Sequence, residues 1–155
     1  MVPARDQLNE RIGKFKEGLK RAGVKLTHQR LEIFREVAGA GDHPDAETIF
    51  RGVRERVPTV SLDTVYRTLW LLVDLGLIST LGTPQDRVRF DPNMKPHHHF
   101  VCTVCGTTMD FYCEDFDRLK VPEQVSGLGM VRATQVEVKG LCRRCMEKAD
   151  SIESK

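Results

Sequence analysis

The sequence lacks any long apolar run, which excludes one large class of proteins. No window approaches the roughly 20 apolar residues that a membrane-spanning helix needs. The first residues, MVPARDQLNERIGK, are charged and have no apolar centre of the kind found in secretory signals. We therefore expect a cytoplasmic protein with no membrane partner.

The sequence also lacks internal repeats, low-complexity tracts and a strong excess of one charge. The net charge of +2 is too small to indicate a nucleic-acid partner by itself. Its distribution is more informative, because residues 1–30 carry eight lysines and arginines against three acidic residues. This local excess suits a surface that faces phosphates, although an ordinary solvated helix face explains it equally well.

Helical periodicity and capping residues predict four helices in the first half of the chain. The first covers residues 4–22. The second begins after Thr27 and ends at the glycines of residues 39–41. The third begins after Asp45 and ends before Pro58, and the fourth covers residues 61–75, with Ser61 as its cap. The stretches LIST and RVRF, which flank the turn LGTPQD, predict a β-hairpin.

Helices followed by a hairpin are the element order of a winged helix-turn-helix, in which residues 61–75 would enter the major groove and the hairpin would be the wing. The exposed face of this helix would offer polar groups to phosphates and base edges. We expect these groups to come from Ser61, Thr64, Tyr66, Arg67 and Thr68. A helical bundle with a polar outer face is the alternative.

The composition changes at the segment DPNMKP, which has two prolines and no helical period. We expect a DNA-binding domain over residues 1–90, a hinge at 91–96 and a second domain at 97–155. The stretches HHHFVC, TTMDFYC and MVRATQVEVKGLC favour strands. A short helix near 114–126 is limited or kinked by Pro122, and the C-terminal end predicts only a final helical turn or two. The predicted class is α+β, with a small α/β second domain.

Four of the five cysteines form two C-x-x-C pairs, Cys102 with Cys105 and Cys142 with Cys145. Four thiolates from two tight turns are the preferred ligands of structural Zn²⁺. A thioredoxin-like redox pair and an iron–sulfur cluster are alternatives. Two C-x-x-C pairs in one small domain argue against the redox pair. We assign no role to Cys113.

Three consecutive histidines precede the first cysteine pair. On a strand, His97 and His99 would share one face, while His98 would point to the other. Because the cysteines already complete one shell, the two imidazoles suggest a second metal centre. Candidate partners are His43, Asp91 and Asp110, which would make a His₃Asp₂ set suited to Fe²⁺, Mn²⁺ or Zn²⁺.

Ordinary structural roles remain open for these histidines. The run at 97–99 could be a polar strand end, and His43 could be a turn residue, since spacing alone does not bring it to His97. A metal site with an open position could also perform metal-assisted chemistry. However, the sequence contains no nucleophile–base pair and no glycine-rich phosphate loop, so we expect no enzyme activity and no catalytic residue. A zinc-stabilised protein-interaction domain is a further alternative.

Six motifs occur in order across nearly the whole chain: GVKLTHQRLEIF, HPDAETIF, SLDTVYRTLWLLVDLGLI, RVRFD, HHHFVCTVCG and GLCRRC. Together they resemble the ferric uptake regulator (Fur) superfamily of metal-dependent repressors. The resemblance implies a homodimer that binds an AT-rich palindromic operator when a regulatory metal is bound. It implies structural zinc on the four paired cysteines and a regulatory metal on His43, Asp91, His97, His99 and Asp110. It also implies DNA contacts by Tyr66 and Arg67, and it places Lys14 at roughly the position of a lysine that contacts the minor groove.

Two features suggest a branch of this superfamily. Iron sensors commonly use glutamates where this chain has Asp91 and Asp110, whereas the peroxide-sensing branch uses aspartates. A third metal site found in many iron sensors would use Pro96, His98, Asp117 and residues 133–134, and two of these positions have no ligating side chain. The resemblance therefore favours a peroxide-sensing repressor with Fe²⁺ or Mn²⁺ and without the third site. An iron-responsive regulator or a zinc-responsive relative is the alternative.

Overall fold

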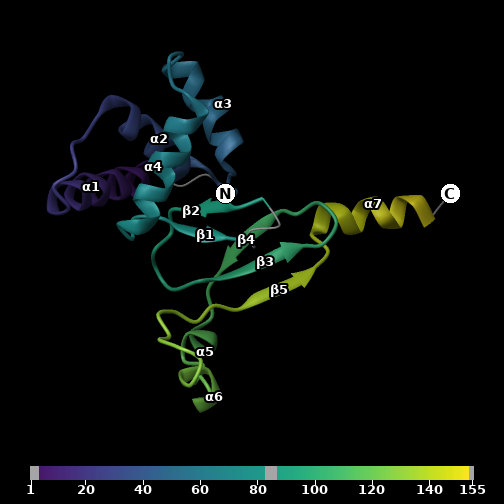
Figure 1. Cartoon of the computed structure of the whole chain (residues 1–155). Helices are drawn as coiled ribbons and strands as arrows, with labels where there is room; N and C mark the ends of the chain where they lie inside the picture. Colours follow the sequence, from purple (N-terminus) through teal and green to yellow (C-terminus); the bar gives the residue numbers. More distant parts are fainter. Residues whose placement is uncertain (1–3, 83–86, 154–155) are drawn as a thin grey trace. The chain divides into compact units, whose positions relative to one another are not determined.

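The chain folds into two compact units, Met1–Met94 and Lys95–Lys155. The computed structural model describes residues 4–82 and 87–153 (Figure 1). The first unit is mostly helical and ends in a two-stranded hairpin, while the second is built on a three-stranded sheet. The predicted α+β class and winged helix are therefore confirmed. None of the described helices has the length and apolar character needed to cross a bilayer.

Four helices make up most of the first unit: α1 (Arg5–Arg21), α2 (His28–Gly39), α3 (Ala46–Arg56) and α4 (Leu62–Asp74). Three of them begin at the predicted caps. The side chains of Thr27, Asp45 and Ser61 each accept a hydrogen bond from the backbone N–H three residues later. Local capping chemistry thus accounts for where these helices begin.

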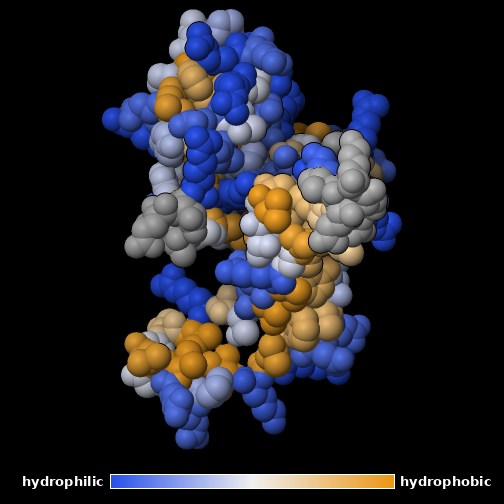
Figure 2. Space-filling view, turned by 90° about the vertical axis from the view of Figure 1, so that its right-hand side faces the viewer, coloured by the Kyte–Doolittle hydropathy of each residue, from blue (hydrophilic) through white to orange (hydrophobic). Residues whose placement is uncertain are grey.

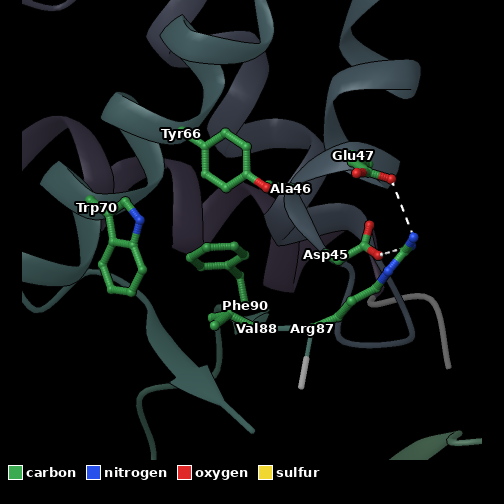
Figure 3. Close-up of a pocket in the computed structure, with 8 residues that line it drawn as sticks. All are labelled: Asp45, Ala46, Glu47, Tyr66, Trp70, Arg87, Val88 and Phe90. Atoms are coloured by element: carbon green, nitrogen blue, oxygen red, sulfur yellow. Dashed lines mark hydrogen bonds and ion pairs between the residues drawn. The ribbon is translucent and has the colours of Figure 1, made fainter. Parts of the chain in front are cut away.

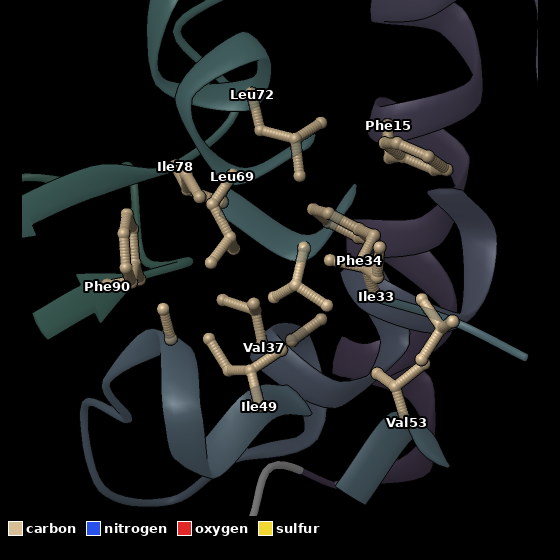
Figure 4. Close-up of a cluster of buried hydrophobic side chains, with 14 of the residues drawn as sticks. Phe15, Ile33, Phe34, Val37, Ile49, Val53, Leu69, Leu72, Ile78 and Phe90 are labelled. Atoms are coloured by element: carbon tan, nitrogen blue, oxygen red, sulfur yellow. The ribbon is translucent and has the colours of Figure 1, made fainter. Parts of the chain in front are cut away.

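The core of the first unit is formed by one apolar face from each of the four helices (Figure 4). The rings of Phe15 and Phe34 stack at a centroid distance of 4.4 Å and join α1 to α2. Leu69 and Leu72 of α4 are fully buried in the same cluster. Burial of this face fixes which side of α4 is left for solvent, and it corrects one expectation. Thr68, expected on the exposed side, is 5% exposed because it lies on the inner face.

The hairpin consists of β1 (Ser79–Leu81) and β2 (Arg89–Asp91), paired antiparallel with Ser79 opposite Asp91. The last four residues of the predicted turn, 83–86, lie outside the described residues. The loop before α3 attaches to the outer side of β2. Phe90 donates its N–H to the Pro44 carbonyl at 3.0 Å, and Asp45 forms an isolated bridge with Arg89.

The second unit contains β3 (His98–Cys102), β4 (Thr108–Phe111) and β5 (Glu137–Gly140) in the order β4-β3-β5. The central strand β3 pairs antiparallel with β4 and parallel with β5. Of the last predicted strand stretch, residues 130–142, only Glu137–Gly140 forms a strand. Residues 130–136 form an irregular connection before it.

The helices of the second unit differ from the prediction in two ways. The segment near 114–126 forms two separate short helices, α5 (Glu114–Asp117) and α6 (Glu123–Ser126). Pro122 caps α6 with an extended backbone, which explains the interruption. The C-terminal helix α7 (Arg143–Glu153) has eleven residues, so it is longer than the one or two turns expected.

Candidate metal centres

The four paired cysteines converge at one end of the second sheet. Cys102 ends β3, and a tight turn that contains Gly106 at φ +71° carries Cys105. The parallel pairing of β5 with β3 sets Gly140 beside Cys102, so the chain delivers Cys142 and Cys145 to the same place. The N–H of Cys142 donates to Cys102 Sγ at 3.3 Å. Register and turn geometry, and not the sequence distance between the pairs, therefore assemble the cluster.

The geometry of the cluster fits zinc. All four Sγ atoms lie within 4.8 Å of one another, and Cys105 Sγ is 3.7 Å from Cys142 Sγ. Tetrahedral Zn–S bonds of about 2.3 Å require sulfur–sulfur distances of about 3.8 Å. The four cysteines form a structural zinc site, as the sequence predicts.

The thiols already have unequal proton affinities. The pKa of Cys105 is lowered to about 5, because Thr107 hydrogen-bonds to its sulfur through both side chain and backbone. The pKa of Cys102 is lowered mainly by the backbone N–H of Cys105. The pKa of Cys145 is raised to about 12, chiefly by its hydrogen bond with Cys142. Clustered thiolates repel one another, and a divalent cation among them offsets that repulsion.

A second group of metal-binding side chains lies on the same sheet. Asp110 of β4 is directly opposite His99 of β3 in the antiparallel register, so their side chains project from one face. His97 joins them from the residue before β3. Its Nε2 lies 3.0 Å from His99 Nε2, and both histidines reach Asp110 Oδ1, at 3.7 and 3.2 Å. This His/Asp group has the donors that Fe²⁺ and Mn²⁺ accept.

His98 points to the opposite face of β3, as strand alternation predicts. Its Nε2 lies 3.1 Å from an Asp117 carboxylate oxygen, and its Nδ1 accepts the N–H of Val136. The ring is 1% exposed and packs among Phe111 and Phe116. These contacts tie β3 to α5 and to the chain before β5. The predicted lack of a third metal site stays a prediction.

The remaining two predicted ligands meet in the first unit. His43 lies in the loop before α3, and Asp91 ends β2. His43 Nε2 is 3.5 Å from Asp91 Oδ2, and both side chains are buried. Asp91 Oδ1 also accepts the N–H of Asn93, which fixes the carboxylate at the end of the strand. The attachment of the Pro44 loop to β2 is what brings this histidine to this aspartate.

The predicted DNA-binding residues occupy the outer surface of the first unit. Tyr66 and Arg67 of α4 are exposed, and Arg67 pairs with Asp63 at 2.9 Å. Ser61 and Thr64 hydrogen-bond to each other in the first turn of α4. On α1, Lys14 pairs with Glu10 at 2.7 Å. Nothing in these positions tests DNA contact, so their roles stay predictions.

A pocket of 240 Å³ beside α4 was not expected from the sequence. It is lined by Tyr66 and Trp70 of α4, Phe90 and Val88 of the hairpin, and the polar group Asp45, Glu47 and Arg87 (Figure 3). Arg87 stands in the stretch RVRF, which predicted only a strand. A positive charge in that stretch gives no indication of an acidic partner more than 40 residues earlier.

Comparison with known proteins agrees with this arrangement. The model of the ferric uptake regulator family matches residues 21–137. The chain is 30% identical over 132 residues to the peroxide-responsive repressor PerR of Staphylococcus epidermidis, covering 85% of this chain and 88% of the relative.

Two solved structures resemble the fold. The ferric uptake regulator Fur of Helicobacter pylori has a TM-score of 0.69 at 23% identity, with 90% of this chain and 93% of that chain covered. A zinc-bound manganese uptake regulator has a TM-score of 0.63 at 27% identity, with coverage of 82% and 97%. From the family match, the PerR relative and these folds, the chain belongs to the ferric uptake regulator family of metal-responsive transcription regulators.

Proposed function

We propose that the protein is a metal-dependent, DNA-binding repressor that senses peroxide. One observation carries the proposal: metal-binding side chains are divided between the unit that contains the winged helix and the unit that contains the zinc site. His43 and Asp91 pair in the first, while His97, His99 and Asp110 cluster in the second. A ligand set divided in this way allows metal binding to select one arrangement of the two units.

All five residues would ligate one Fe²⁺ or Mn²⁺ in the metal-bound protein. The imidazoles would bind through nitrogen, and Asp91 and Asp110 would offset the charge of the ion. Zinc at the four cysteines would have a different task, because its binding free energy stabilises the fold of a small unit. The protein would act in the cytoplasm, where DNA and reduced thiols are both found.

Repression requires two copies of the winged helix at a fixed spacing on a palindromic operator. A homodimer through the second unit would supply them. That unit exposes large apolar side chains, among them Leu128 at 87% and Met130 at 86%, and apolar surface is visible around α5 and α6 at the bottom of Figure 2. Contiguous exposed apolar surface is typical of protein–protein contacts.

On DNA, we propose that α4 reads the major groove through Tyr66 and Arg67, while Ser61 and Thr64 contact phosphates. Arg67 is exposed together with its partner Asp63, so exchanging that partner for a phosphate or a guanine edge costs little. Lys14 would reach the backbone or the minor groove from α1. The AT-rich nature of the operator rests on the family resemblance.

The peroxide part of the proposal rests on the two aspartates and on the PerR relative, whose name describes a peroxide-responsive repressor. Bound Fe²⁺ with an open coordination position would activate peroxide for O–O cleavage. One peroxide oxygen would add to a ring carbon of His43 or His97, which is oxidised by two electrons, and the other oxygen would leave as water. The oxidised imidazole would then ligate poorly. The units would lose their shared ligand set, and DNA would be released.

Operator binding in the presence of Fe²⁺ and of Mn²⁺, before and after peroxide, tests the proposal. The DNA would be a duplex selected from a random library by the Mn²⁺-loaded protein. We expect peroxide to abolish binding of the Fe²⁺ protein only, with one oxygen added to the peptide that contains His43 or His97. His43→Ala should lose metal-dependent DNA binding and keep zinc.

Each other outcome points to a different function. Fe²⁺-dependent binding that survives peroxide without histidine oxidation would support the iron-responsive alternative. Binding that responds only to Zn²⁺ would support a zinc-responsive regulator. If no library duplex is retained in a salt-dependent manner under any metal, the protein is not a DNA-binding repressor.

A further inference from the structure

Arg87 holds two acidic side chains at the start of α3. Its guanidinium lies 2.9 Å from Asp45 Oδ2 and 3.5 Å from Glu47 Oε2 (Figure 3). The side chain of Asp45 is only 17% exposed, whereas that of Arg87 is 71% exposed. The pair therefore links a fixed carboxylate to an arginine on the hairpin.

Asp45 uses both of its oxygens in this region. One accepts the N–H of Thr48 and caps α3, and the other accepts from Arg87. The backbone beside it bonds to β2, through Pro44 O and the N–H of Phe90. Because the cap already holds the carboxylate in place, the arginine gains a partner without ordering a second flexible chain.

The two proposed metal ligands of the first unit lie on the same two segments. His43 precedes Asp45 by two residues, and Asp91 follows Arg87 by four. The ion pair thus closes the loop of His43 onto the strand of Asp91, next to the point where His43 Nε2 and Asp91 Oδ2 stand 3.5 Å apart. A loop that leaves β2 would take the imidazole away from the carboxylate.

We infer that Arg87 is a positioning residue for the regulatory metal: it clamps Asp45 and so holds His43 and Asp91 at ligating distance. The inference rests on the proposed function, since it assigns a task within that metal site. Arg87 pairs with Asp45 and Glu47, and it acts on the ligands through Asp45. Its effect comes from raising the fraction of molecules in which the half-site is formed, and apparent metal affinity falls in proportion to that fraction.

Electrostatics alone predicts a different effect of Arg87 removal on metal affinity, so a measurement distinguishes the two explanations. Arg87 is a cation near a cation-binding site, so its removal should tighten metal binding by simple electrostatics. Removal of the negative charge of Asp45 should loosen it. The clamp predicts that both changes loosen binding, and that the second change adds little once the first has been made.

The experiment measures Mn²⁺ affinity of the full-length, zinc-containing protein without DNA, by electron paramagnetic resonance of free Mn²⁺. The variants are Arg87→Ala, Arg87→Lys, Asp45→Asn and the Arg87→Ala/Asp45→Asn double variant. Asparagine caps a helix nearly as well as aspartate, so Asp45→Asn leaves the helix start intact. Arg54→Ala is the matched control, because Arg54 is an arginine of α3 that lies over the Phe50 ring.

We expect Arg87→Ala and Asp45→Asn each to weaken Mn²⁺ binding about two- to five-fold, the scale of an exposed ion pair. The double variant should bind Mn²⁺ no more weakly than the single variant with the larger loss. Arg87→Lys should retain part of the affinity that Arg87→Ala loses, and Arg54→Ala should bind Mn²⁺ like the wild type. Trp70 fluorescence during urea unfolding would show that the first unit stays folded in each variant.

Unchanged or tighter binding by Arg87→Ala, or additive losses in the double variant, would overturn the inference while leaving the proposed function intact. A His43→Ala variant separates the two. If it binds Mn²⁺ as tightly as the wild type does, the proposed metal site itself is wrong, and the positioning role of Arg87 is wrong with it.

Discussion

Three adjacent histidines have different surroundings because neighbouring side chains of a strand point to opposite faces of the sheet. His97 and His99 approach Asp110, while His98 is buried on the other face against Asp117. The alternation of a strand separates them, since successive side chains leave opposite faces. The same residue type therefore serves a candidate metal site at two positions and a packing contact at the third.

Cysteine replacement separates the zinc ligands from the remaining thiol. We expect Cys102→Ser to lose zinc and to unfold the second unit, because apparent binding free energies of structural zinc reach about 10–16 kcal/mol in zinc-finger peptides. Zinc content by mass spectrometry and far-UV circular dichroism would measure both effects.

Cys113→Ser is the control for this change. Cys113 is half-buried outside the zinc cluster, and its carbonyl lies near His98 Nε2. We expect one zinc per chain and a wild-type spectrum. Loss of zinc in this variant would contradict the assignment of the four ligands.

Glu32 gives the first unit a pH-dependent stability. It is 3% exposed. Its Oε2 accepts a hydrogen bond from Arg56 Nε at 2.6 Å, and its Oε1 accepts one from Arg35 Nη1 at 2.8 Å. Burial raises the pKa of Glu32, but the hydrogen bond from Arg56 and the charge of Arg35 outweigh this, so the net pKa lies below 4.5. A lowered carboxyl pKa stabilises the fold above the unfolded pKa, and the contribution is lost as the pH falls through the folded pKa.

We therefore expect Glu32→Gln to lower the free energy of unfolding by about 1–3 kcal/mol at neutral pH. The difference from the wild type should shrink as the pH falls below 4.5, the ordinary value for glutamate. Urea unfolding followed by Trp70, the single tryptophan, measures this in the first unit. A difference that is constant from pH 7 to below 4 would contradict the role of the charge.

At the scale of the element, α4 serves two surfaces. Its inner face buries Val65, Leu69 and Leu72, and its outer face presents Tyr66 and Arg67. The apolar face anchors the helix, so the outer residues are held in a fixed orientation for their proposed task. Stability and DNA reading should consequently respond to different substitutions on the same helix.

Leu69→Ala tests the anchoring face. Leu69 is fully buried, and removal of its side chain should cost about 2–5 kcal/mol through lost burial and the resulting cavity. Leu26→Ala is the control, because Leu26 is 42% exposed and should change stability by no more than about 0.5 kcal/mol. Equal losses in the two variants would contradict the core described for this unit.

At the scale of the whole molecule, two compact units should respond differently to zinc removal. The cysteines all belong to the second unit, whereas Trp70 belongs to the first. We expect a strong zinc chelator to remove much of the circular dichroism of the second unit while the urea transition of Trp70 remains. Loss of both signals together would mean that the first unit depends on the zinc site for its stability.

The sequence determined much of this protein. Local signals set the starts of α2, α3 and α4, since the caps Thr27, Asp45 and Ser61 act within one helical turn. The two C-x-x-C pairs predicted zinc, because each pair delivers two ligands from one short turn. The resemblance to a known family supplied the set of regulatory ligands, which spacing alone did not.

The tertiary structure decided what depends on contacts between distant segments. The register of β3 with β4 sets Asp110 opposite His99, and the bonding of the Pro44 loop to β2 brings His43 to Asp91. The burial of Thr68 and the ion pair of Arg87 with Asp45 also emerged only there. The physical reason is common to all of them: pairing register and burial are chosen by the free energy of the folded unit, and no short stretch of sequence contains both partners.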